Sequence, residues 1–459
     1  MSASLLSPPQ LLRHAAELVR LLLKSPQPPR LLTSQYLHDK KKLTPDAKAA
    51  ISSLAFHTLR HLRLARYLAD GGTGEIRSLD TRTASACTAA ALYLDVVRAV
   101  YDGAALDDAL HGIAEAVVQE AGLDITDLRT RMEELATLHP GRDGLHWALF
   151  RSVPGWIMEM WLREQRVRTT YPRPEALASG LLHPAPLTLR VNTARARSEE
   201  VLTSLLDAGI QARAHPLLPH ALVLDRREQL LGSEWEAKGL IEIQDAGSQL
   251  IGHALAPLRG WDVLDACAGA GGKTLQLTDA LSGSGSITAA DVERMRLTAL
   301  RLRAERLGQK DLEIRAVPPK GDLAEIFQRR QFDAVVVDAP CSGFGTARRN
   351  PLVKWKLQPK SLNKLAEKQF DILLRNAALV KPGGVLLYAT CSLLPTENEH
   401  VVERFLRHAD DFTPAPLAEA LTGMLQKSVL SDPDQSMLTL DPALLDSDGF
   451  FIARLRRRR

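Results

Sequence analysis

Two cysteines in the last third of the chain each follow a short apolar run that is typical of a buried strand. Cys341 follows the run in FDAVVVDAPC, and Cys391 follows the run in GGVLLYATC. Runs of this length predict parallel strands that are covered on both faces. Parallel strands end at one edge of a sheet, where open α/β sheets bind ligands. Two thiols there, beside Asp338, indicate covalent chemistry on an electrophilic carbon, although free cysteines are also common core residues.

A glycine-rich turn between a predicted strand and a predicted helix, VLDACAGAGGKTLQL, indicates a nucleotide-binding site. Gly269, Gly271 and Gly272 would let the backbone approach a ligand, and the start of the following helix favours negative charge. A phosphate-binding loop requires a glycine five residues before Gly272, where this chain has Cys267. A dinucleotide-binding fold requires a third glycine that this turn lacks.

S-adenosyl-L-methionine is the remaining class of nucleotide ligand. Its sites use an acid near the end of the first strand, which is Asp265 here, and an acid at the end of the second strand, which is Asp291 here. The second acid would hold the ribose hydroxyls. A structural glycine turn in some other α/β enzyme is the alternative interpretation of this segment alone.

The elements that must position these residues begin near Leu258 and alternate between strand and helix. The predicted strands are WDVLDAC, SITAAD, LEIRAV, FDAVVVDAP and GGVLLYATC, and the helices between them include one over residues 359–379. This alternation predicts a doubly wound parallel sheet. We therefore expect a Rossmann-like α/β catalytic domain over residues 256–459.

Upstream of this domain the sequence pattern changes twice. PLTLRVN, SEEVLTSLLDAG, ALVLD and GLIEIQD predict a small α+β domain over residues 181–255, and a helical linker is expected over residues 141–180. Residues 1–140 predict an all-α domain, because apolar residues recur at helical spacing: Leu12, Ala15, Ala16, Val19 and Leu22. The predicted fold is therefore multidomain, with all-α, small α+β and α/β parts in that order.

A cap predicts where one long N-terminal helix begins. Thr44 followed by Pro45 is typical of a first turn, and the helix AKAAISSLAFHTLRHLRLARYL follows. We expect this helix to present a basic face, made of His57, Arg60, His61, Arg63 and Arg66. His57 and His61 have the spacing of metal ligands, but the TLR between them lacks the glutamate of a zinc-protease helix. No residue is therefore assigned to a metal.

The composition is that of an ordinary globular chain. Its 459 residues are enough for about three domains, with 45% hydrophobic and 24% charged residues. No run of eighteen apolar residues predicts a membrane span, and the N-terminus lacks a secretory signal pattern. The four cysteines lack CxxC spacing, which argues against a zinc module and a disulfide framework. We expect a cytoplasmic monomer with reduced thiols.

Positive charge is concentrated in two stretches, although the net charge is only +4. Between Cys341 and Lys368 there are seven basic residues and one acid, Glu367, and the chain ends in RLRRRR. Such stretches fit phosphate contacts, although a run of charge is more often a solvated face. The basic residues of the first stretch are Arg348, Arg349, Lys354, Lys356, Lys360, Lys364 and Lys368.

These segments together resemble the Sun/RsmB family of RNA cytosine-5 methyltransferases. DACAGAGGKT, DAPCSGFG with RRNP after it, QFDILLRNAALVKPGG and YATCSLLPTENE resemble family motifs in the family's order. LRVN and QDAGSQL resemble its small domain, which is RRM-like, and DGFFIARL resembles its last strand. The helical N-terminus resembles the NusB-like RNA-binding domain of the bacterial ribosomal RNA member. The resemblance covers residues 187–455, and more loosely residues 1–160.

The resemblance implies roles for individual residues. Cys391 is the expected nucleophile, Cys341 assists product release, and Lys273 lies in the active site. Spacing alone leaves the thiols interchangeable, because cytosine-5 methyltransferases acting on DNA use a Pro-Cys thiol, which would point to Cys341. Asp338 is expected to bind the N3 and amino edge of the base. The expected cofactor-binding residues are Cys267, Ala268, Gly269, Ala270, Gly271, Gly272, Lys273, Asp291, Asp322 and Asp338.

The sequence departs from the family pattern in two places. Gly269-Ala270 stands where the family has Ala-Pro, which loses a rigid residue but keeps the close backbone approach. AVPPKGD precedes Leu323, and its two prolines affect where the third strand ends and what Asp322 can contact. Of the other cysteines, Cys267 is expected to pack behind the cofactor and Cys87 in a core.

The chemistry explains why two thiols are needed. Cytosine C5 is a poor nucleophile until a thiolate adds to C6, and a base must later remove the C5 proton. No histidine occurs between His253 and His400, so proton transfer falls to carboxylates, thiols or water. The base must also leave its stack, and RNA is read best in single-stranded loops.

We therefore predict an S-adenosylmethionine-dependent enzyme that forms 5-methylcytosine in small-subunit (16S) ribosomal RNA. The NusB-like N-terminus favours ribosomal RNA over the first alternative, a transfer RNA cytosine-5 methyltransferase. A non-catalytic RNA-binding protein is the second alternative, and a binder would have no need for both thiols. A protein or DNA methyltransferase is a weaker one. RNA is the expected partner, and no membrane contact is expected.

Overall fold

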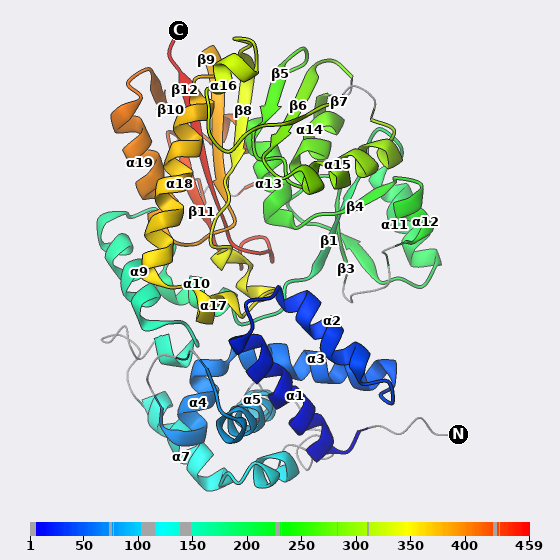
Figure 1. Ribbon diagram of the computed structural model, residues 1–459, viewed down its shortest axis with the longest axis vertical. Helices are drawn as coiled ribbons and strands as arrows, with labels where there is room; N and C mark the ends of the chain where they lie inside the picture. Colours follow the sequence, from blue (N-terminus) through cyan, green and yellow to red (C-terminus); the bar gives the residue numbers. More distant parts are fainter. Residues whose placement is uncertain are drawn as a thin grey trace. The chain divides into compact units, whose positions relative to one another are not determined.

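The computed structural model describes residues 6–72, 76, 78–101, 115–137, 148–224, 230, 232–281, 283–309, 312–425, 429–430 and 432–459. The chain divides into two compact units (Figure 1). Unit 1 consists of residues 1–167, 173–183 and 346–357, and unit 2 consists of residues 168–172, 184–345 and 358–459. The predicted border between a helical domain and a linker, at residues 140 and 141, lies outside the described residues.

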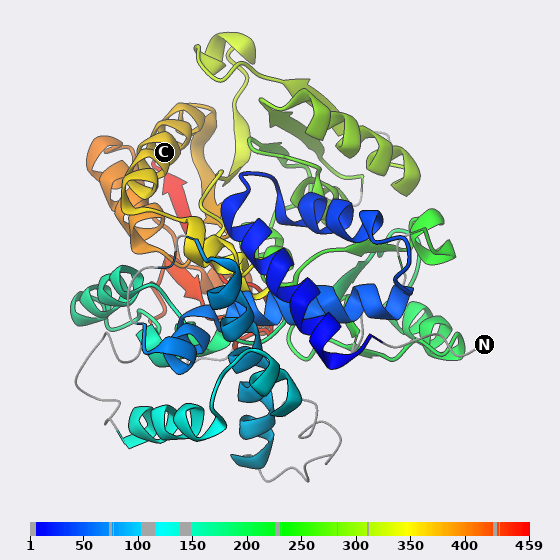
Figure 2. The ribbon, with the colours of Figure 1, turned by 60° about the horizontal axis from the view of Figure 1, so that its bottom comes forward.

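The helices and strands that the structure describes in unit 1 are all helices, which confirms the predicted helical N-terminal region. Its helix α1 packs against α3 and α5 (Figure 2). The predicted apolar stripe of α1 is buried, from Leu12 to Leu22. Thr44 caps α3 as predicted, by accepting a hydrogen bond from the Ala47 N–H at 3.2 Å. The helices are α1 (Pro8–Lys24), α2 (Pro29–Asp39), α3 (Pro45–Arg60), α4 (Leu62–Asp70), α5 (Thr81–Tyr101), α7 (Ile125–Thr137), α9 (Gly155–Val167), α10 (Pro174–Gly180) and α17 (Val353–Lys356).

The long helix predicted after Thr44 is in fact two helices, α3 and α4, which meet at His61. Side chains from a distant segment donate hydrogen bonds to the backbone carbonyls at this break. Trp355 donates to the Leu59 carbonyl at 2.7 Å, and Lys354 donates to the Arg60 carbonyl at 2.6 Å. Because these carbonyls bond to side chains, the helix changes direction without leaving them unpaired.

The predicted basic face of this helix is not exposed. Arg60, His61 and Arg63 are buried, with exposed fractions of 7%, 2% and 7%. Arg63 donates to the Val153 carbonyl at 2.7 Å, and Arg60 donates to the Arg348 carbonyl at 3.1 Å. Periodicity alone cannot tell a basic face in solvent from one that satisfies buried carbonyls. The predicted basic face therefore lies mostly inside unit 1.

Residues 346–357 belong to unit 1, although they follow the Cys341 segment directly. Lys354 is 1% exposed and donates to the carbonyls of Arg60 and Ser152 at 2.6 and 2.8 Å. Arg348 is also buried and donates to the His183 carbonyl at 3.0 Å. Two of the seven basic residues predicted for phosphate contact therefore satisfy backbone carbonyls inside unit 1 instead.

The smaller of two sheets in unit 2 is antiparallel, with the order β2-β3-β1-β4. It confirms the predicted small α+β region. Its elements are β1 (Leu187–Val191), α11 (Ser198–Asp207), β2 (Ala212–Ala214), β3 (Ala221–Leu224), α12 (Glu234–Ala237) and β4 (Ile241–Ile243). Helix α13 (Ala246–Leu255) follows and connects it to the larger sheet.

The larger sheet has the order β10-β12-β9-β8-β5-β6-β7, with β11 paired to β12. Its five strands from β9 to β7 are parallel, as predicted. Strand β12 pairs in an antiparallel direction with β9, β10 and β11, so the sheet is mixed rather than purely parallel. The strands are β5 (Asp262–Asp265), β6 (Ser286–Asp291), β7 (Leu312–Ala316), β8 (Phe332–Asp338), β9 (Val380–Thr390), β10 (Phe412–Pro414), β11 (Met437–Leu440) and β12 (Phe450–Arg457).

Helices cover both faces of this sheet, which is why its central strands are apolar throughout. One hydrophobic core joins the sheet to α13, α14 and α20, and the other joins it to α16, α18 and α19. Helix α18 lies beside β8 and β9 in Figure 1, and α19 packs against α18. The covering helices not yet bounded are α14 (Gly272–Leu281), α15 (Arg294–Leu307), α16 (Leu323–Ile326), α18 (Pro359–Ala377), α19 (Glu399–His408) and α20 (Ala418–Leu421).

Buried ion pairs join the small sheet to the helices of the large one. Arg190 of β1 pairs with Asp279 of α14, and both side chains are less than a tenth exposed. Glu242 of β4 pairs with Arg303 and Arg306 of α15. Since a buried charge without its partner is costly, these pairs fix the small sheet against the helices α14 and α15 of the large sheet.

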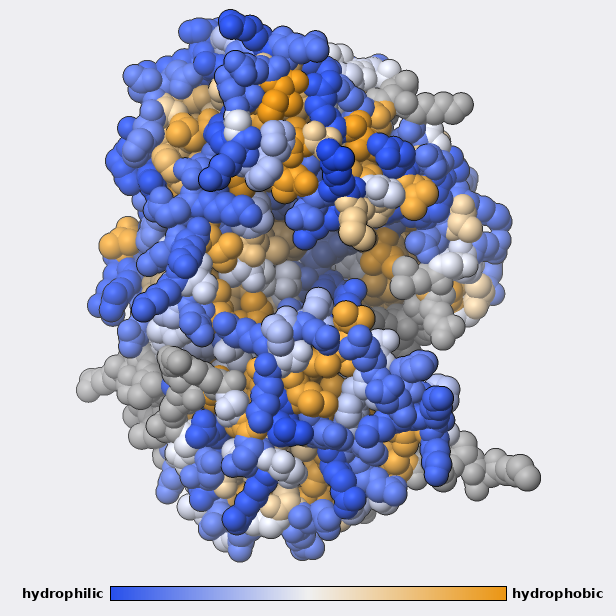
Figure 3. All heavy atoms as spheres, in the orientation of Figure 1, coloured by the Kyte–Doolittle hydropathy of each residue, from blue (hydrophilic) through white to orange (hydrophobic). Residues whose placement is uncertain are grey.

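The surface is mostly hydrophilic on the face drawn in Figure 3, where hydrophobic side chains are interrupted by charged ones. Exposed large hydrophobic residues do occur, among them Met295 and Leu302 of α15. Among the described residues, no helix is long and apolar enough to span a membrane.

Candidate active site

Four neighbouring strands bring the predicted residues to one edge of the large sheet. β5, β6 and β8 end at Asp265, Asp291 and Asp338, and β9 ends one residue before Cys391. From β5 the chain proceeds to β6 and β7 on one side, whereas β8 and β9 lie on the other side. Such a switch point opens a crevice at the carboxyl ends of the strands.

The two predicted thiols meet at this edge. The sulfur atoms of Cys341 and Cys391 lie 3.3 Å apart, and both side chains are partly exposed. The hydrogen bond between the thiols, together with burial, raises the pKa of Cys341 well above its ordinary value. The Gly345 N–H donates to the Cys391 carbonyl at 3.0 Å, which ties the two cysteine segments together.

Lys273 and Asp338 form an ion pair beside the thiols. Lys273, in the first turn of α14, donates to Asp338 at the end of β8 at 2.7 Å. Burial lowers the pKa of Lys273, but the charge of Asp338 and the hydrogen bond to it outweigh burial, so the pKa is raised. A negative charge at Cys391 acts in the same direction. The structure thus brings all four predicted catalytic residues to the same edge.

The acid at the end of β6 supports the glycine turn. Asp291 is 7% exposed and accepts hydrogen bonds from the N–H groups of Gly269 and Glu293, each at 2.8 Å. Gly269 has φ +55° and Gly271 has φ +88°. A Cβ at Gly271 would lie 2.1 Å from the Leu300 Cδ1 of α15. The turn therefore requires glycine both for its backbone angles and for its packing on α15.

The rest of the glycine turn is tied to the neighbouring elements. The Ala268 N–H donates to the Ala290 carbonyl at 3.0 Å, and Arg303 donates to the Ala270 carbonyl at 2.5 Å. No atom lies within 4 Å of a Cβ placed at Gly272, so the start of α14 is open on that side. Burial raises the pKa of Cys267 well above its ordinary value, which fits a packing role rather than a reactive one.

Asp265 carries an unpaired buried oxygen at the centre of this edge. Its side chain accepts a hydrogen bond from the Thr274 hydroxyl at 2.7 Å, and the residue is 1% exposed. The other carboxylate oxygen has no hydrogen-bond partner among the described residues. Burial raises the pKa of Asp265 to about 6. An unpaired buried acceptor is costly, and the Cys267 N–H, which acts to lower the pKa of Asp265, offsets burial only in part.

Asp322 lies apart from the strand ends. It is exposed, follows β7 by six residues, and caps α16 by accepting from the Ala324 N–H at 2.8 Å. Its predicted contact with the cofactor therefore stays a prediction. Cys87 is fully buried in the core of unit 1, and burial raises its pKa to about 12.

Sequence reasoning missed Glu397, which accepts hydrogen bonds from the serines that follow the two cysteines. It is 0% exposed, and its carboxylate accepts from the Ser342 N–H at 2.7 Å and from the Ser392 hydroxyl at 2.6 Å. Its signal in the sequence was an acid six residues after Cys391 within YATCSLLPTENE. Nothing in one sequence distinguishes such an acid from a solvent-exposed one.

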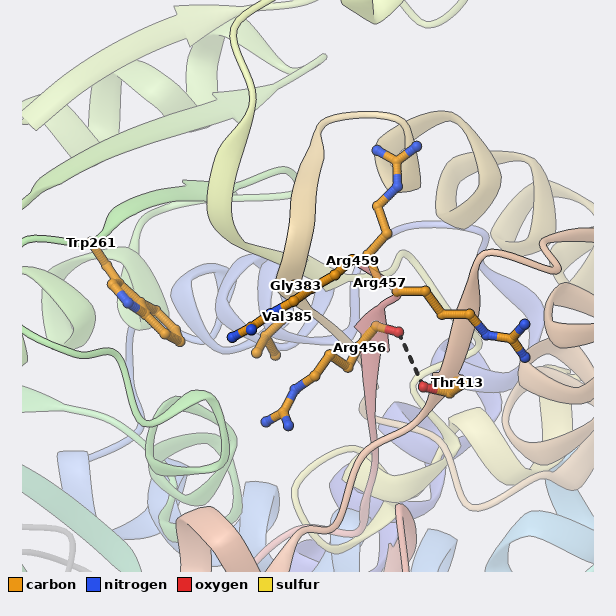
Figure 4. Close-up of a pocket in the computed structure, with 8 residues that line it drawn as sticks. Trp261, Gly383, Val385, Thr413, Arg456, Arg457 and Arg459 are labelled. Carbon is orange, nitrogen blue, oxygen red and sulfur yellow. Dashed lines mark hydrogen bonds between the residues drawn. The ribbon is translucent and has the colours of Figure 1, made fainter.

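A separate cavity of about 360 Å³ lies at the opposite edge of the sheet (Figure 4). Trp261 precedes β5, and Gly383 and Val385 lie in the first half of β9, so the cavity is far along these strands from Cys391. Its remaining lining residues are Thr413, Arg456, Arg457, Arg458 and Arg459. It contains none of the predicted site residues.

Known proteins resemble this chain in both sequence and fold. Residues 252–456 match the protein family described as 16S rRNA methyltransferase RsmB/F, and residues 153–230 match the ferredoxin-like domain of RsmF/B-like methyltransferases. The probable ribosomal RNA small subunit methyltransferase B of Bacillus subtilis (strain 168) is 33% identical over 307 residues, which cover 67% of each chain.

Two further proteins extend the likeness. The ribosomal RNA small subunit methyltransferase B of Cronobacter sakazakii is 29% identical over 424 residues, covering 91% of this chain and 92% of the relative. The fold resembles that of NSun6 from Pyrococcus horikoshii, solved with SFG, at a TM-score of 0.55 and 18% identity. That likeness covers 66% of this chain and 97% of NSun6.

Proposed function

Because the chain belongs to the RsmB/F family of 16S ribosomal RNA methyltransferases, we propose that it forms 5-methylcytosine in small-subunit ribosomal RNA. It is an RNA methyltransferase, which confirms the predicted family and sets aside a non-catalytic RNA-binding protein. The relatives are named for small-subunit ribosomal RNA, which favours that substrate over transfer RNA. The observation that carries cytosine-5 chemistry is the pair of thiols 3.3 Å apart.

The proposed methyl donor is S-adenosylmethionine, which supplies an electrophilic methyl group. The residues at the strand ends fit it: the buried Asp291 can accept from ribose hydroxyls, and Asp265 offers an unpaired oxygen to a donor. The open side of the turn at Gly269 and Gly272 leaves room for close approach. SFG, found with NSun6, is an S-adenosylmethionine analogue and supports this choice. Asp322 remains a candidate for the adenine side.

The proposed reaction begins when the Cys391 thiolate bonds to C6 of cytosine. This addition breaks the C5–C6 double bond and makes C5 nucleophilic, so that C5 can accept the methyl group. A base then removes the C5 proton, the C5–C6 double bond re-forms, and the Cys391–C6 bond breaks. We assign assistance in this release to Cys341. Its raised pKa keeps this thiol protonated at rest, so it must first give its own proton to water or a carboxylate before its thiolate can take the C5 proton.

Asp338 and Lys273 are proposed to hold the base in this reaction. Asp338 can accept a hydrogen bond from the amino group of cytosine, and its ion pair with Lys273 fixes its orientation. Lys273 remains positively charged because its pKa is raised.

The parts outside the large sheet are proposed to hold the RNA. We assign residues 1–140 to a NusB-like RNA-binding domain, residues 141–180 to a linker, and residues 181–255 to a small RRM-like domain. Residues 256–459 form the catalytic domain in this division. We also propose that the enzyme acts as a monomer in the cytoplasm, where ribosomal RNA would be its substrate.

Bisulfite sequencing tests the function directly. A strain that lacks the gene should lose one or more 5-methylcytosines from small-subunit ribosomal RNA and keep those of transfer RNA. The purified chain should restore them in vitro with S-adenosylmethionine. Loss confined to transfer RNA would instead support the alternative substrate, and no loss in either RNA would contradict cytosine-5 methylation.

A further inference from the structure

Both cysteines are followed by a serine, and both serines bond to one carboxylate. Ser342 follows Cys341 and donates its N–H and its hydroxyl to Glu397 at 2.7 and 2.6 Å. Ser392 follows Cys391 and donates its hydroxyl to Glu397 at 2.6 Å. One side chain thus links two segments that lie 50 residues apart in the chain.

Glu397 is itself held firmly. It accepts from Gln369 of α18 at 2.9 Å, and its backbone carbonyl accepts from the Tyr388 hydroxyl at 2.6 Å. The residue is 0% exposed. Burying a carboxylate is costly unless its oxygens are hydrogen-bonded, and here four donors satisfy it.

The neighbouring residue fixes the second cysteine segment in the same way. Asn398 donates to the Ser392 carbonyl at 3.0 Å and accepts from the Thr390 hydroxyl at 2.6 Å. The backbone on either side of Cys391 is therefore fixed. The segment of Cys341 depends instead on Glu397, on the Gly345 N–H, and on Gln369, which donates to the Pro340 carbonyl at 3.0 Å.

We propose that Glu397 is a positioning residue that holds the two thiols within reach of the same carbon atom. The inference rests on the proposed function for its role in methyl transfer, but the positioning itself can be tested without that reaction. Without the carboxylate, the serines lose their common acceptor and the cysteine segments can separate. A displacement of about 1 Å at a reacting group can cost about 100-fold in rate.

The charge of Glu397 adds a second effect on Cys341. The groups that face this thiol are Cys391 from the segment after β9, Tyr388 from β9, and Glu397. Hydrogen bonding to Cys391 and burial are the main causes of its raised pKa, and the negative charge of Glu397 acts in the same direction. Removing only the charge should therefore make Cys341 more acidic.

The test uses the rate at which the two thiols form a disulfide. Diamide oxidises two thiols to one disulfide and is itself reduced to a hydrazine, and thiols 3.3 Å apart need only a small movement to reach bonding distance. The full-length chain is treated with diamide, quenched with an alkylating reagent, and analysed by peptide mass spectrometry. The cross-linking rate is divided by the alkylation rate of Cys341, which corrects for the changed acidity of that thiol. This normalised rate should be about tenfold lower in Glu397→Ala than in the unmodified chain.

Two variants guard against general unfolding. Ser342→Ala combined with Ser392→Ala removes both hydroxyl contacts but keeps the buried carboxylate, and it should also slow cross-linking. Glu399→Gln alters a buried acid two residues away that accepts from Thr439, and its cross-linking rate should stay within about twofold. Cross-linking that is unchanged in both Glu397→Ala and the double variant would overturn the proposal.

Methylation activity gives an independent test of the role of Glu397. In methylation assays Glu397→Ala should lower kcat about 100-fold while KM for RNA changes less than about threefold, because Glu397 positions reacting groups rather than RNA. Glu397→Gln should keep more activity and should speed alkylation of Cys341 at pH 8. If the unmodified chain methylates no RNA, the proposed function fails, while the cross-linking result still decides the role of Glu397.

Discussion

Cys341 and Cys391 place their sulfur atoms 3.3 Å apart across 50 residues of chain. Strands β8 and β9 are parallel neighbours, with Asp338 opposite Ala389, so the segments that follow them leave the sheet side by side. Proximity of this kind lets one thiol attack a carbon atom while the other serves a later step at the same ring. It is the relationship on which the proposed reaction depends.

Loss of the Asp291 carboxylate should weaken the cofactor site. Asp291→Ala removes an acceptor for ribose hydroxyls and the partner of the Gly269 N–H, so S-adenosylmethionine binding should weaken by about 1–3 kcal/mol. Titration calorimetry measures this. Asp333→Ala, at the opposite end of the sheet, is the control and should bind normally. Equal affinity in both variants would remove Asp291 from the site.

The raised pKa of Asp265 predicts that the free energy of unfolding falls as the pH rises. The folded chain binds this proton up to about pH 6, whereas the unfolded chain releases it near the ordinary value of 3.8. The contribution of Asp265 to stability is therefore fully present below about pH 4 and is lost as the pH rises through about 6. Relative to Asp265→Asn, the unmodified chain should lose about 2 kcal/mol of unfolding free energy between pH 4 and pH 7.

Denaturant unfolding at several pH values checks this prediction, because other titrating groups cancel in the comparison of the two chains. Ligand-free protein must be used, since a bound donor would occupy the unpaired oxygen of Asp265. A difference between the chains that stays constant from pH 4 to pH 7 would show that burial does not perturb this carboxyl.

A row of lysines on α18 should contribute to RNA binding. Lys360, Lys364 and Lys368 are exposed and spaced four residues apart, so they share one face of the helix. They lie in the half of α18 that leads to Gln369, which bonds beside Cys341. Replacing all three by Gln should lower the salt slope of RNA binding by about 2, at about 0.7 per contact to a single strand.

Filter binding of ribosomal RNA fragments over a range of salt concentrations measures that slope. Lys381→Gln is the control, because Lys381 pairs with Asp333 at the other end of the sheet. The same slope in the triple variant and the control would mean that this helix face is only solvated, as most charged faces are.

The buried Lys354 should stabilise unit 1. Lys354→Met would leave the carbonyls of Arg60 and Ser152 without their donor, so unit 1 should lose about 1–3 kcal/mol for each carbonyl that stays dry. Lys364→Met on the surface of α18 is the matched control. Circular dichroism during urea unfolding compares them, and equal midpoints would contradict a structural role for Lys354.

The sequence predicted the residues at the strand ends better than it predicted the contacts between distant segments. Short apolar runs that end in Asp265, Asp291 and Asp338 indicated strands, and parallel strands necessarily gather such residues at one edge. The apolar stripe of α1 predicted its buried face for a similar reason. These features depend on local pattern alone.

Features that depend on distant partners could not be predicted in this way. The break at His61 requires donors from residues 354 and 355, and the burial of Arg60 requires a carbonyl from residue 348. The antiparallel direction of β12 is set by its pairing with β9 rather than by its own sequence. Glu397 is similar, since its importance comes from two serines that only the fold brings together.

The most direct test of the proposed reaction is the fate of the RNA in two single variants. Cys391→Ala should be inactive and form no covalent adduct, because it cannot attack C6. Cys341→Ala should attack and methylate but release product slowly, so an enzyme–RNA adduct should survive denaturing electrophoresis. An adduct that accumulates in Cys391→Ala instead would reverse the two roles, and two active variants without any adduct would contradict covalent catalysis.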